Sequence, residues 1–166
     1  MNAQQHLNAD LRISGFHLMD VELGSLSVQV KEEATDRYRS TLALDAEKNQ
    51  LSATVLADLS HSTPNITLDS DIDLNDLSLF SPFVKGYLFE LGGALNGPLH
   101  YSQISDDVKV RGQVAVTDGR LGLIQTGAVY RIPNDTVLFD ERGLSFTDFA
   151  LLDARDNRFL LDGHVI

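Results

Sequence analysis

The segment LSATVLADL, residues 51–59, places an apolar side chain at every second position, namely at Leu51, Ala53, Val55, Ala57 and Leu59. Successive side chains of a β-strand point to opposite faces, so this period of two is typical of a strand with one dry and one wet face. The segment therefore predicts a strand in a sheet that is buried, or otherwise shielded from water, on one side.

The same alternation recurs on both sides of this segment. The apolar positions before it are Leu7, Ala9, Leu11 and Ile13, then Leu26, Val28 and Val30. Those after it are Ile66, Leu68, Ile72 and Leu74, and the intervening positions include Asp69, Asp71, Asp73 and Asn75. Because four polar residues share one parity, that face of the predicted strand must point to water.

The spacing changes at residues 77–92. Apolar residues there recur at intervals of three and four, at Phe80, Phe83, Val84, Tyr87, Leu88 and Leu91. This period predicts one amphipathic helix at 77–92, with Ser81 and Pro82 as its N-cap and first position and Gly92 at its end. The helix would separate a first strand block, 1–76, from a second, 93–166, within one unit that spans residues 1–166.

Strand patterns resume after the helix, and Asp118–Gly119 predicts a hairpin turn that leads to Leu121 and Leu123. We count about a dozen strands by these criteria. At about 4.8 Å between neighbours they would extend for roughly 55 Å, too far to stay flat given the usual twist. The predicted fold is all-β with one short helix, built as a long, curved, mainly antiparallel sheet.

Composition narrows the range of functions. With 43% hydrophobic and 22% charged residues, the chain of 166 residues has the composition of a folded protein. The net charge of −11, without a basic patch, argues against nucleic acid as a partner, and the absence of cysteine excludes thiol-based metal and redox chemistry. The apolar run at 83–95 is too short to cross a bilayer. Because no signal peptide follows Met1, we expect an excised piece with an added start methionine.

Several kinds of site were sought in the sequence. The acidic stretch DSDIDLND, residues 69–76, resembles a calcium loop, but Leu74 replaces the loop glycine and Phe80 the twelfth-position Glu. The five histidines stand singly, at His6, His17, His61, His100 and His164. The glycines of GGALNG, residues 92–97, miss the dinucleotide fingerprint and are expected to end the helix and open a strand. We predict no enzyme, no metal site and no cofactor.

The stretch from Leu91 onward contains LGGALNGPLHYS, DVKVRGQVAVTDGRLGL and TGAVYRIPNDTVLFDERGLSFTDFALLDARDNRFLLDGHVI. It resembles the C-terminal region of the TamB family, in which Gly-x-Leu-x-Gly and Val-x-Gly-x-Val-x-Val-x-Asp-Gly repeats precede a strand pair and a closing phrase. The matching positions are Gly93, Leu95, Gly97, Val110, Gly112, Val114, Val116, Asp118, Gly119, Phe139, Gly143, Leu144, Phe146, Phe149, Leu151, Asp153, Leu161, Gly163 and Val165. Residues before Leu91 share only the alternation of apolar and polar positions with this family.

The resemblance implies a periplasmic segment of an inner-membrane-anchored protein, related to AsmA-like proteins, whose sheet folds like a taco around an apolar groove. It also implies phospholipid or unfolded outer-membrane strands as cargo and a TamA-like outer-membrane barrel as partner, with no contact segment identifiable here. The residues assigned to the groove are Leu51, Val55, Leu59, Ile66, Leu68, Leu95, Leu99, Tyr101, Val108, Val110, Val114, Val116, Leu121, Leu123, Phe139, Phe146, Phe149, Leu151, Phe159 and Leu161.

The main alternative is a passive interaction or spacer module of an envelope protein, built as a closed β-sandwich. Both structures require the same alternation, and they differ in whether the dry face is sealed against the chain itself. A carbohydrate-binding module is a weaker alternative, because aromatic residues make up only 7% of the chain and tryptophan is absent.

Overall fold

A computed structural model describes residues 7–19, 21–141 and 143–165, and twelve strands make up most of this part of the chain. The first seven are β1 (Asn8–Ile13), β2 (His17–Leu18), β3 (Val21–Glu22), β4 (Ser25–Ala34), β5 (Arg37–Asp45), β6 (Asn49–Asp58) and β7 (Asn65–Leu74). A 3₁₀ helix, η1 (Leu77–Val84), follows them. The remaining strands are β8 (Leu88–Ile104), β9 (Asp107–Leu123), β10 (Ala128–Asp140), β11 (Gly143–Leu152) and β12 (Arg158–Val165).

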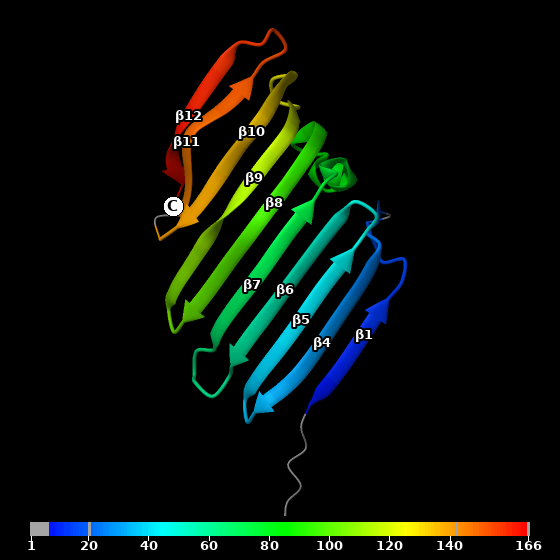
Figure 1. Cartoon of the computed structure of the whole chain (residues 1–166), viewed down its shortest axis with the longest axis vertical. Helices are drawn as coiled ribbons and strands as arrows, with labels where there is room; N and C mark the ends of the chain where they lie inside the picture. Colours follow the sequence, from blue (N-terminus) through cyan, green and yellow to red (C-terminus); the bar gives the residue numbers. More distant parts are fainter. Residues whose placement is uncertain (1–6, 20, 142, 166) are drawn as a thin grey trace, which may run out of the picture.

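Ten of the strands form one antiparallel sheet in the order β1-β4-β5-β6-β7-β8-β9-β10-β11-β12, while β2 and β3 pair only with each other (Figure 1). Apart from the detour through β2 and β3, every strand of the large sheet pairs with its neighbour in the chain. The first and last strands do not meet, so the sheet is not closed into a barrel. The predicted fold class, a long antiparallel sheet with one short helix, is confirmed.

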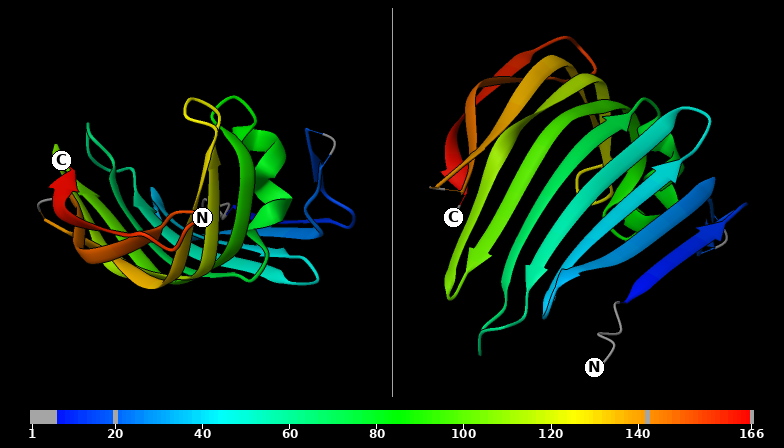
Figure 2. Two further views of the ribbon diagram at one scale, coloured as in Figure 1. Left: turned by 90° about the horizontal axis from the view of Figure 1, so that it is seen from above. Right: turned by 60° about the horizontal axis from the view of Figure 1, so that its bottom comes forward.

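The sheet is strongly curved. Seen along its long axis, its strands bend so that both of their ends rise on the same side, as in a trough (Figure 2). A sheet this wide cannot stay flat, because each strand is rotated relative to its neighbour. No second sheet packs face to face against it among the described residues, so the closed sandwich considered as an alternative is wrong as an architecture.

The helix is shorter than predicted and has a different N-cap. It spans Leu77–Val84, and its N-cap is Asp76, whose carboxylate accepts from the backbone N–H of Ser78 at 3.1 Å; Pro82 lies inside the helix. The helical prediction for residues 88–92 is wrong, because this segment begins β8 and pairs with β9, with Leu91 opposite Leu121. The backbone bonds offered by a neighbouring strand outweigh the local helical spacing there.

The prediction of a hairpin turn at Asp118–Gly119 is also wrong. These residues lie inside β9, which is one continuous strand. Asp118 has a φ of 48°, and the pairing of β8 with β9 shifts by one residue at this level, between Gly92 and Ala94. A turn residue in the left-handed region can form a bulge instead of a hairpin when both flanking segments pair with another strand.

The bulge in β9 is one of several irregularities that lie beside one another in adjacent strands. Gly93 of β8 has a φ of 101°, and a Cβ there would lie 2.7 Å from the carbonyl oxygen of Asp118. Pro133, which has no N–H to donate, lies beside Asp118 in the β9–β10 register, and β11 shifts its pairing with β12 around Asp148, whose φ is 51°. Bulges bend strands and increase twist, so this line of irregularities accounts for the sharp bend of the C-terminal half.

The backbone pairing of β10 with β11 is interrupted next to these irregularities. Register partners are found at Arg131 and Leu152 and again at Leu138 and Ser145, but not between them. Asp135 occupies the interruption, and its Oδ2 accepts from the backbone N–H of Ala150 at 2.7 Å. A side chain thus replaces a missing backbone acceptor and leaves that buried donor satisfied.

The core is small and lies in the C-terminal half. Val116, Ile132 and Phe149, from three adjacent strands, are each no more than 8% exposed and form one cluster. The half-buried residues packed around it are Leu95, Leu121, Val137, Phe146 and Leu151. In the N-terminal half the buried residues are Leu23 and Asn49, neither of which belongs to such a cluster.

A candidate apolar binding face

Strand register assigns the apolar residues to one side of the sheet. Cross-strand partners point to the same face, so a row of partners can be followed from edge to edge. One row is Leu11, Val28, Leu42, Ala53, Ser70, Leu99, Gly112, Phe139, Leu144 and Val165. The next row is Ala9, Val30, Ser40, Val55, Leu68, Tyr101 and Val110. We call this side the apolar face.

The bulges keep apolar side chains on this face on both sides of the bend. Val114 and Val116 lie on it before the bulge, and Leu121 and Leu123 lie on it afterwards although their numbers have the opposite parity. The same change of parity separates Phe146 from Phe149 in β11, and the rings of these two residues meet edge to face at 5.3 Å. Without the extra residue in each strand, the far end of the strand would turn its apolar side chains to the other face.

The opposite face is polar and carries most of the ion pairs. Examples are Arg37 with Asp58 at 3.0 Å and Lys109 with Asp107 at 2.9 Å, all four on strands β5, β6 and β9. The hydroxyl of Ser60, more than Arg37, holds the pKa of Asp58 below its usual range. This face therefore needs no further covering, because its charged groups are hydrated or paired.

Among the residues that the structure describes, no second layer of strands covers the apolar face. Its side chains remain exposed at both edge strands, with Leu11 at 52% and Phe159 at 47%, and at the start of β9, with Val108 at 53%. No side chain of the described residues is less than 2% exposed. The chain has an accessible surface of 10995 Å², whereas a compact monomer of its mass would expose about 8,100 Å². The larger accessible surface is expected for an open sheet, because one of its faces is not covered.

Burial indicates that the apolar face is the concave one. Val114, Val116 and Phe149 reach 4 to 8% exposure although the large sheet has no partner sheet on that side. Side chains on the inner side of a bend converge and exclude water from one another, whereas those on the outer side splay apart. The concave side of the curved sheet in Figure 2 is therefore the side to which we assign the apolar side chains.

The structure brings together all of the predicted groove residues except Leu59. That residue lies beyond the end of β6, where its N–H donates to the carbonyl oxygen of Asp36, and its side chain is 47% exposed. Because Leu59 lies outside the strand, its assignment to the groove stays a prediction. The others line the face defined above.

Sequence reasoning also missed some members of the face. Leu42 and Leu44 in β5 alternate as clearly as their neighbours, and Ile132 is one of the most buried residues in the molecule. The alternation of RYRSTLALD, residues 37–45, was a sufficient signal for the first two. The alternation did not reveal Ile132, because Pro133 follows it and the apolar positions of this strand then change from even to odd residue numbers.

The acidic stretch of β7 lies on the polar face and has protein partners. Asp69 Oδ1 lies 2.6 Å from Nδ1 of His100, and Asp73 Oδ1 accepts from the side-chain amides of Asn75 and Asn96 at 2.7 and 2.6 Å. Within residues 7–19, 21–141 and 143–165, no group of three His, Asp or Glu side chains is arranged to hold a metal ion. His6 lies outside the described residues.

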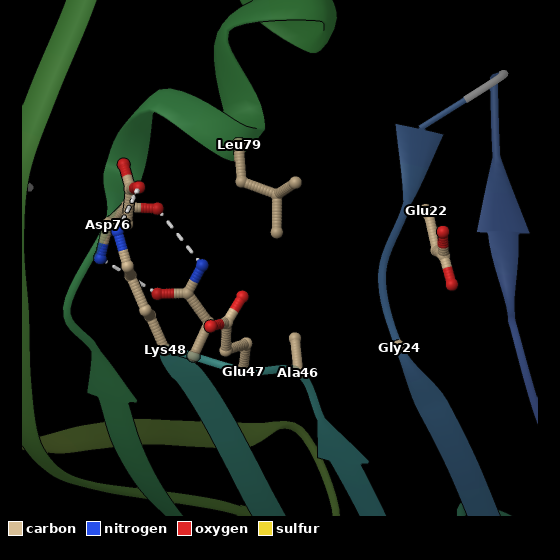
Figure 3. A pocket seen from close by; sticks show the side chains of 8 residues that line it. Glu22, Gly24, Ala46, Glu47, Lys48, Asp76 and Leu79 are labelled. Carbon is tan, nitrogen blue, oxygen red and sulfur yellow. Dashed lines mark hydrogen bonds and ion pairs between the residues drawn. The ribbon is translucent and has the colours of Figure 1, made fainter.

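A polar hollow of about 380 Å³ lies at one end of the N-terminal half, between η1, the β5–β6 turn and the start of β4 (Figure 3). The Asn49 side chain, 3% exposed, donates to the Asp76 carbonyl oxygen at 3.0 Å and accepts from the Asp76 N–H at 2.9 Å. Lys48 pairs with the Asp76 carboxylate at 3.6 Å, and the Ser78 hydroxyl is the main cause that lowers the pKa of Asp76. These contacts fix η1 to the sheet.

No helix in the described part of the chain has the length and apolar character needed to cross a membrane. No family model matches the chain, and neither a curated protein nor a solved structure matches it. The resemblance to the TamB family therefore stays a prediction.

Proposed function

We propose that the apolar face shields hydrocarbon from water and does so without catalysis. The observation that carries this proposal is the continuous apolar side of a ten-stranded sheet, concave and left open to solvent. An exposed apolar surface of this extent marks a binding surface in a folded protein. An elongated, featureless trough suits a flexible chain better than a compact ligand that needs directed polar contacts.

Acyl chains fit this surface on energetic grounds. Transfer of one methylene from water to an apolar environment contributes about 0.8 kcal/mol. A chain of about 16 carbons, half of its surface covered by the open trough, would thus gain on the order of 6 kcal/mol before ordering costs. Because this attraction has no preferred direction, a bound chain can slide along the face.

We propose phospholipid acyl chains, or apolar strands of unfolded outer-membrane proteins, as the bound groups. The location in the periplasm, the anchoring of the parent protein in the inner membrane and the TamA-like barrel partner rest on the sequence resemblance alone. The physical part of the proposal stands on the apolar face and is tested separately.

The test uses single-cysteine variants, because the natural sequence contains no cysteine. Val55 lies on the apolar face and the adjacent Thr54 on the polar face of the same strand. Each is replaced, as Val55→Cys or Thr54→Cys, and labelled with an environment-sensitive fluorophore. We expect palmitoyl lysophospholipid, added below its micelle concentration, to shift the emission to the blue at position 55 and to leave position 54 unchanged.

An unchanged emission spectrum at both positions, in protein with a native circular dichroism spectrum, would count against hydrocarbon binding and favour the spacer function. Equal shifts at both positions would show that the lipid associates without regard to the face. Circular dichroism with and without lipid distinguishes binding from unfolding.

A further inference from the structure

An apolar patch interrupts the polar face at the end of the sheet where β8 begins and β9 ends. Tyr87 is 75% exposed, Phe89 54% and Ile124 48%. These three residues, which we call the rim patch, belong to inner strands of the large sheet or to the turns beside them. Large apolar side chains that gather on an otherwise polar surface mark a contact with another apolar surface.

Strand pairing places two members of the rim patch side by side. Leu88 pairs with Leu123, and both point to the apolar face. The next pair along the strands is Tyr87 with Ile124, joined by a hydrogen bond from the N–H of Ile124 to the carbonyl oxygen of Tyr87 at 3.1 Å. Because side chains alternate along a strand, this pair points to the polar face.

A bulge adds Phe89 to the rim patch. The pairing of β8 with β9 shifts by one residue between Leu88 and Glu90, so Phe89 is the extra residue. Its ring lies over Gly122 of β9, where a Cβ would come within 2.6 Å of the ring atom Cε2. The missing side chain at Gly122 therefore leaves the place that the ring occupies on the polar face.

The rim patch projects from the molecule. A Cβ at Gly86 or Gly127, in the two turns that flank it, would meet no atom within 4 Å. The turn between β9 and β10 rises at the rim of the curved sheet (Figure 2). At about 200 Å² for a large side chain, the three residues expose on the order of 350 Å². This is less than half of the roughly 800 Å² that each partner buries in a stable protein interface.

A bilayer surface suits a small projecting patch better than a protein does, because each side chain can insert by itself. Tyrosine is enriched at the interface between membrane and water, where its ring lies among headgroups. Both signs of charge flank the rings, since Lys85 is exposed and Arg120 pairs with Glu90 at 3.6 Å. A zwitterionic headgroup complements this arrangement: its phosphate can pair with Lys85, and its ammonium can lie over an aromatic ring.

We propose that the rim patch docks the protein on the surface of a zwitterionic phospholipid bilayer, with the rings of Tyr87 and Phe89 inserted among the headgroups. The rim patch lies on the opposite face from the apolar trough, so docking does not depend on hydrocarbon binding in the trough. A bilayer is also the source of the acyl chains that the proposed function requires.

A tryptophan reporter tests the docking, because the natural sequence contains no tryptophan. The reporter variant is Tyr87→Trp. The matched control is Ile104→Trp, at the other end of β8, where Ile104 is 60% exposed on the polar face beside Asp106 and Asp107. We expect phosphatidylcholine vesicles to shift the emission of Tyr87→Trp to the blue, and lipids brominated near the headgroup to quench it. Ile104→Trp should show neither effect.

The absence of a shift in both variants, or equal shifts in both, would overturn the proposal. So would a blue shift of Tyr87→Trp that rises with protein concentration without vesicles, because it would show that a second copy covers the rim patch. The lysophospholipid response at position 55 is measured separately, so its failure would contradict hydrocarbon binding in the trough and leave the docking standing.

Vesicle flotation gives an independent measurement. Tyr87→Ser with Phe89→Ser should lower the fraction of protein that floats with phosphatidylcholine vesicles at least fivefold, whereas Ile104→Ser should leave it unchanged. Circular dichroism checks the fold of each variant. If the double variant does not fold, Tyr87→Ser alone, at a side chain that is 75% exposed, should lower the fraction at least twofold. An unchanged fraction in the folded variant would contradict the docking.

Discussion

The two halves of the sheet follow the same sequence pattern but differ in what their apolar face becomes. In the N-terminal half, β4 to β7 pair in register over their full lengths apart from one shift near Glu32, and their apolar side chains remain half-buried. In the C-terminal half, bulges bend β8 to β11, and Val116, Ile132 and Phe149 become buried. Alternation decides which face is apolar, and curvature decides how far that face is buried.

The largest expected effect is a difference in the loss of stability when an apolar side chain is removed from each half. Phe149→Ala removes a ring packed against Val116 and Ile132 and should lower the free energy of unfolding by about 3 kcal/mol or more. Leu42→Ala, on the same face of the regular half, should lower it by only about 1 kcal/mol because that side chain already meets water. Urea unfolding measures both, and equal losses would contradict the distinction between the halves.

The next effect concerns the bend itself. Gly93→Ala introduces a Cβ 2.7 Å from the Asp118 carbonyl oxygen at a φ of 101°, so it should destabilise the protein by about 2 kcal/mol. Gly86→Ala is the matched control, because a Cβ there meets nothing within 4 Å, and it should change stability by less than about 0.5 kcal/mol. If the two variants unfold at the same urea concentration, the account of the bend is wrong.

A smaller effect is expected where the backbone pairing of β10 with β11 is interrupted. Asp135→Ala leaves the Ala150 N–H without its acceptor and should lower the free energy of unfolding by about 1.5 kcal/mol, with faster amide exchange at Ala150. Asp69→Ala removes an exposed partner of His100 and should have an effect below about 0.5 kcal/mol. Hydrogen exchange at Ala150 that is unchanged by Asp135→Ala would show that the carboxylate is not the relevant acceptor.

The smallest effect lies at the cap of η1. Asp76→Ala should lower the free energy of unfolding by about 1 kcal/mol at neutral pH, whereas Asp76→Asn keeps a good N-cap and should lower it less. The folded-state pKa of Asp76 is lowered, so the contribution of its charge is present above pH 4 and is lost as the pH falls below that. Unfolding curves of wild type and Asp76→Ala should therefore converge in acid, and a constant difference would contradict this.

Sequence predicted the parts of the fold that depend on local pattern. The alternation in residues 51–59 and 66–75 identified β6, β7 and the orientation of their two faces. It did not predict that residues 88–92 join a strand, because that outcome depends on β9 as a partner. The bulge at Asp118 was equally hidden, since the same residues in another context form a hairpin turn.

The candidate site was predictable to the same degree. Residues such as Val55 and Leu68 follow directly from the alternation, whereas the burial of Ile132 follows from a bend that only the assembled strands create. Leu59 shows the limit at a strand end, where the pattern continues for one residue more than the strand.

The central claim is that hydrocarbon occupies the apolar face, and native mass spectrometry of protein purified from cells tests it most directly. We expect bound phospholipid on wild type and on Thr54→Asp, whose new charge lies on the polar face, and at least a fivefold lower occupancy on Val55→Asp, whose charge lies in the trough. Folded samples of all three that carry no lipid, or equal amounts of lipid on all three, would contradict the claim.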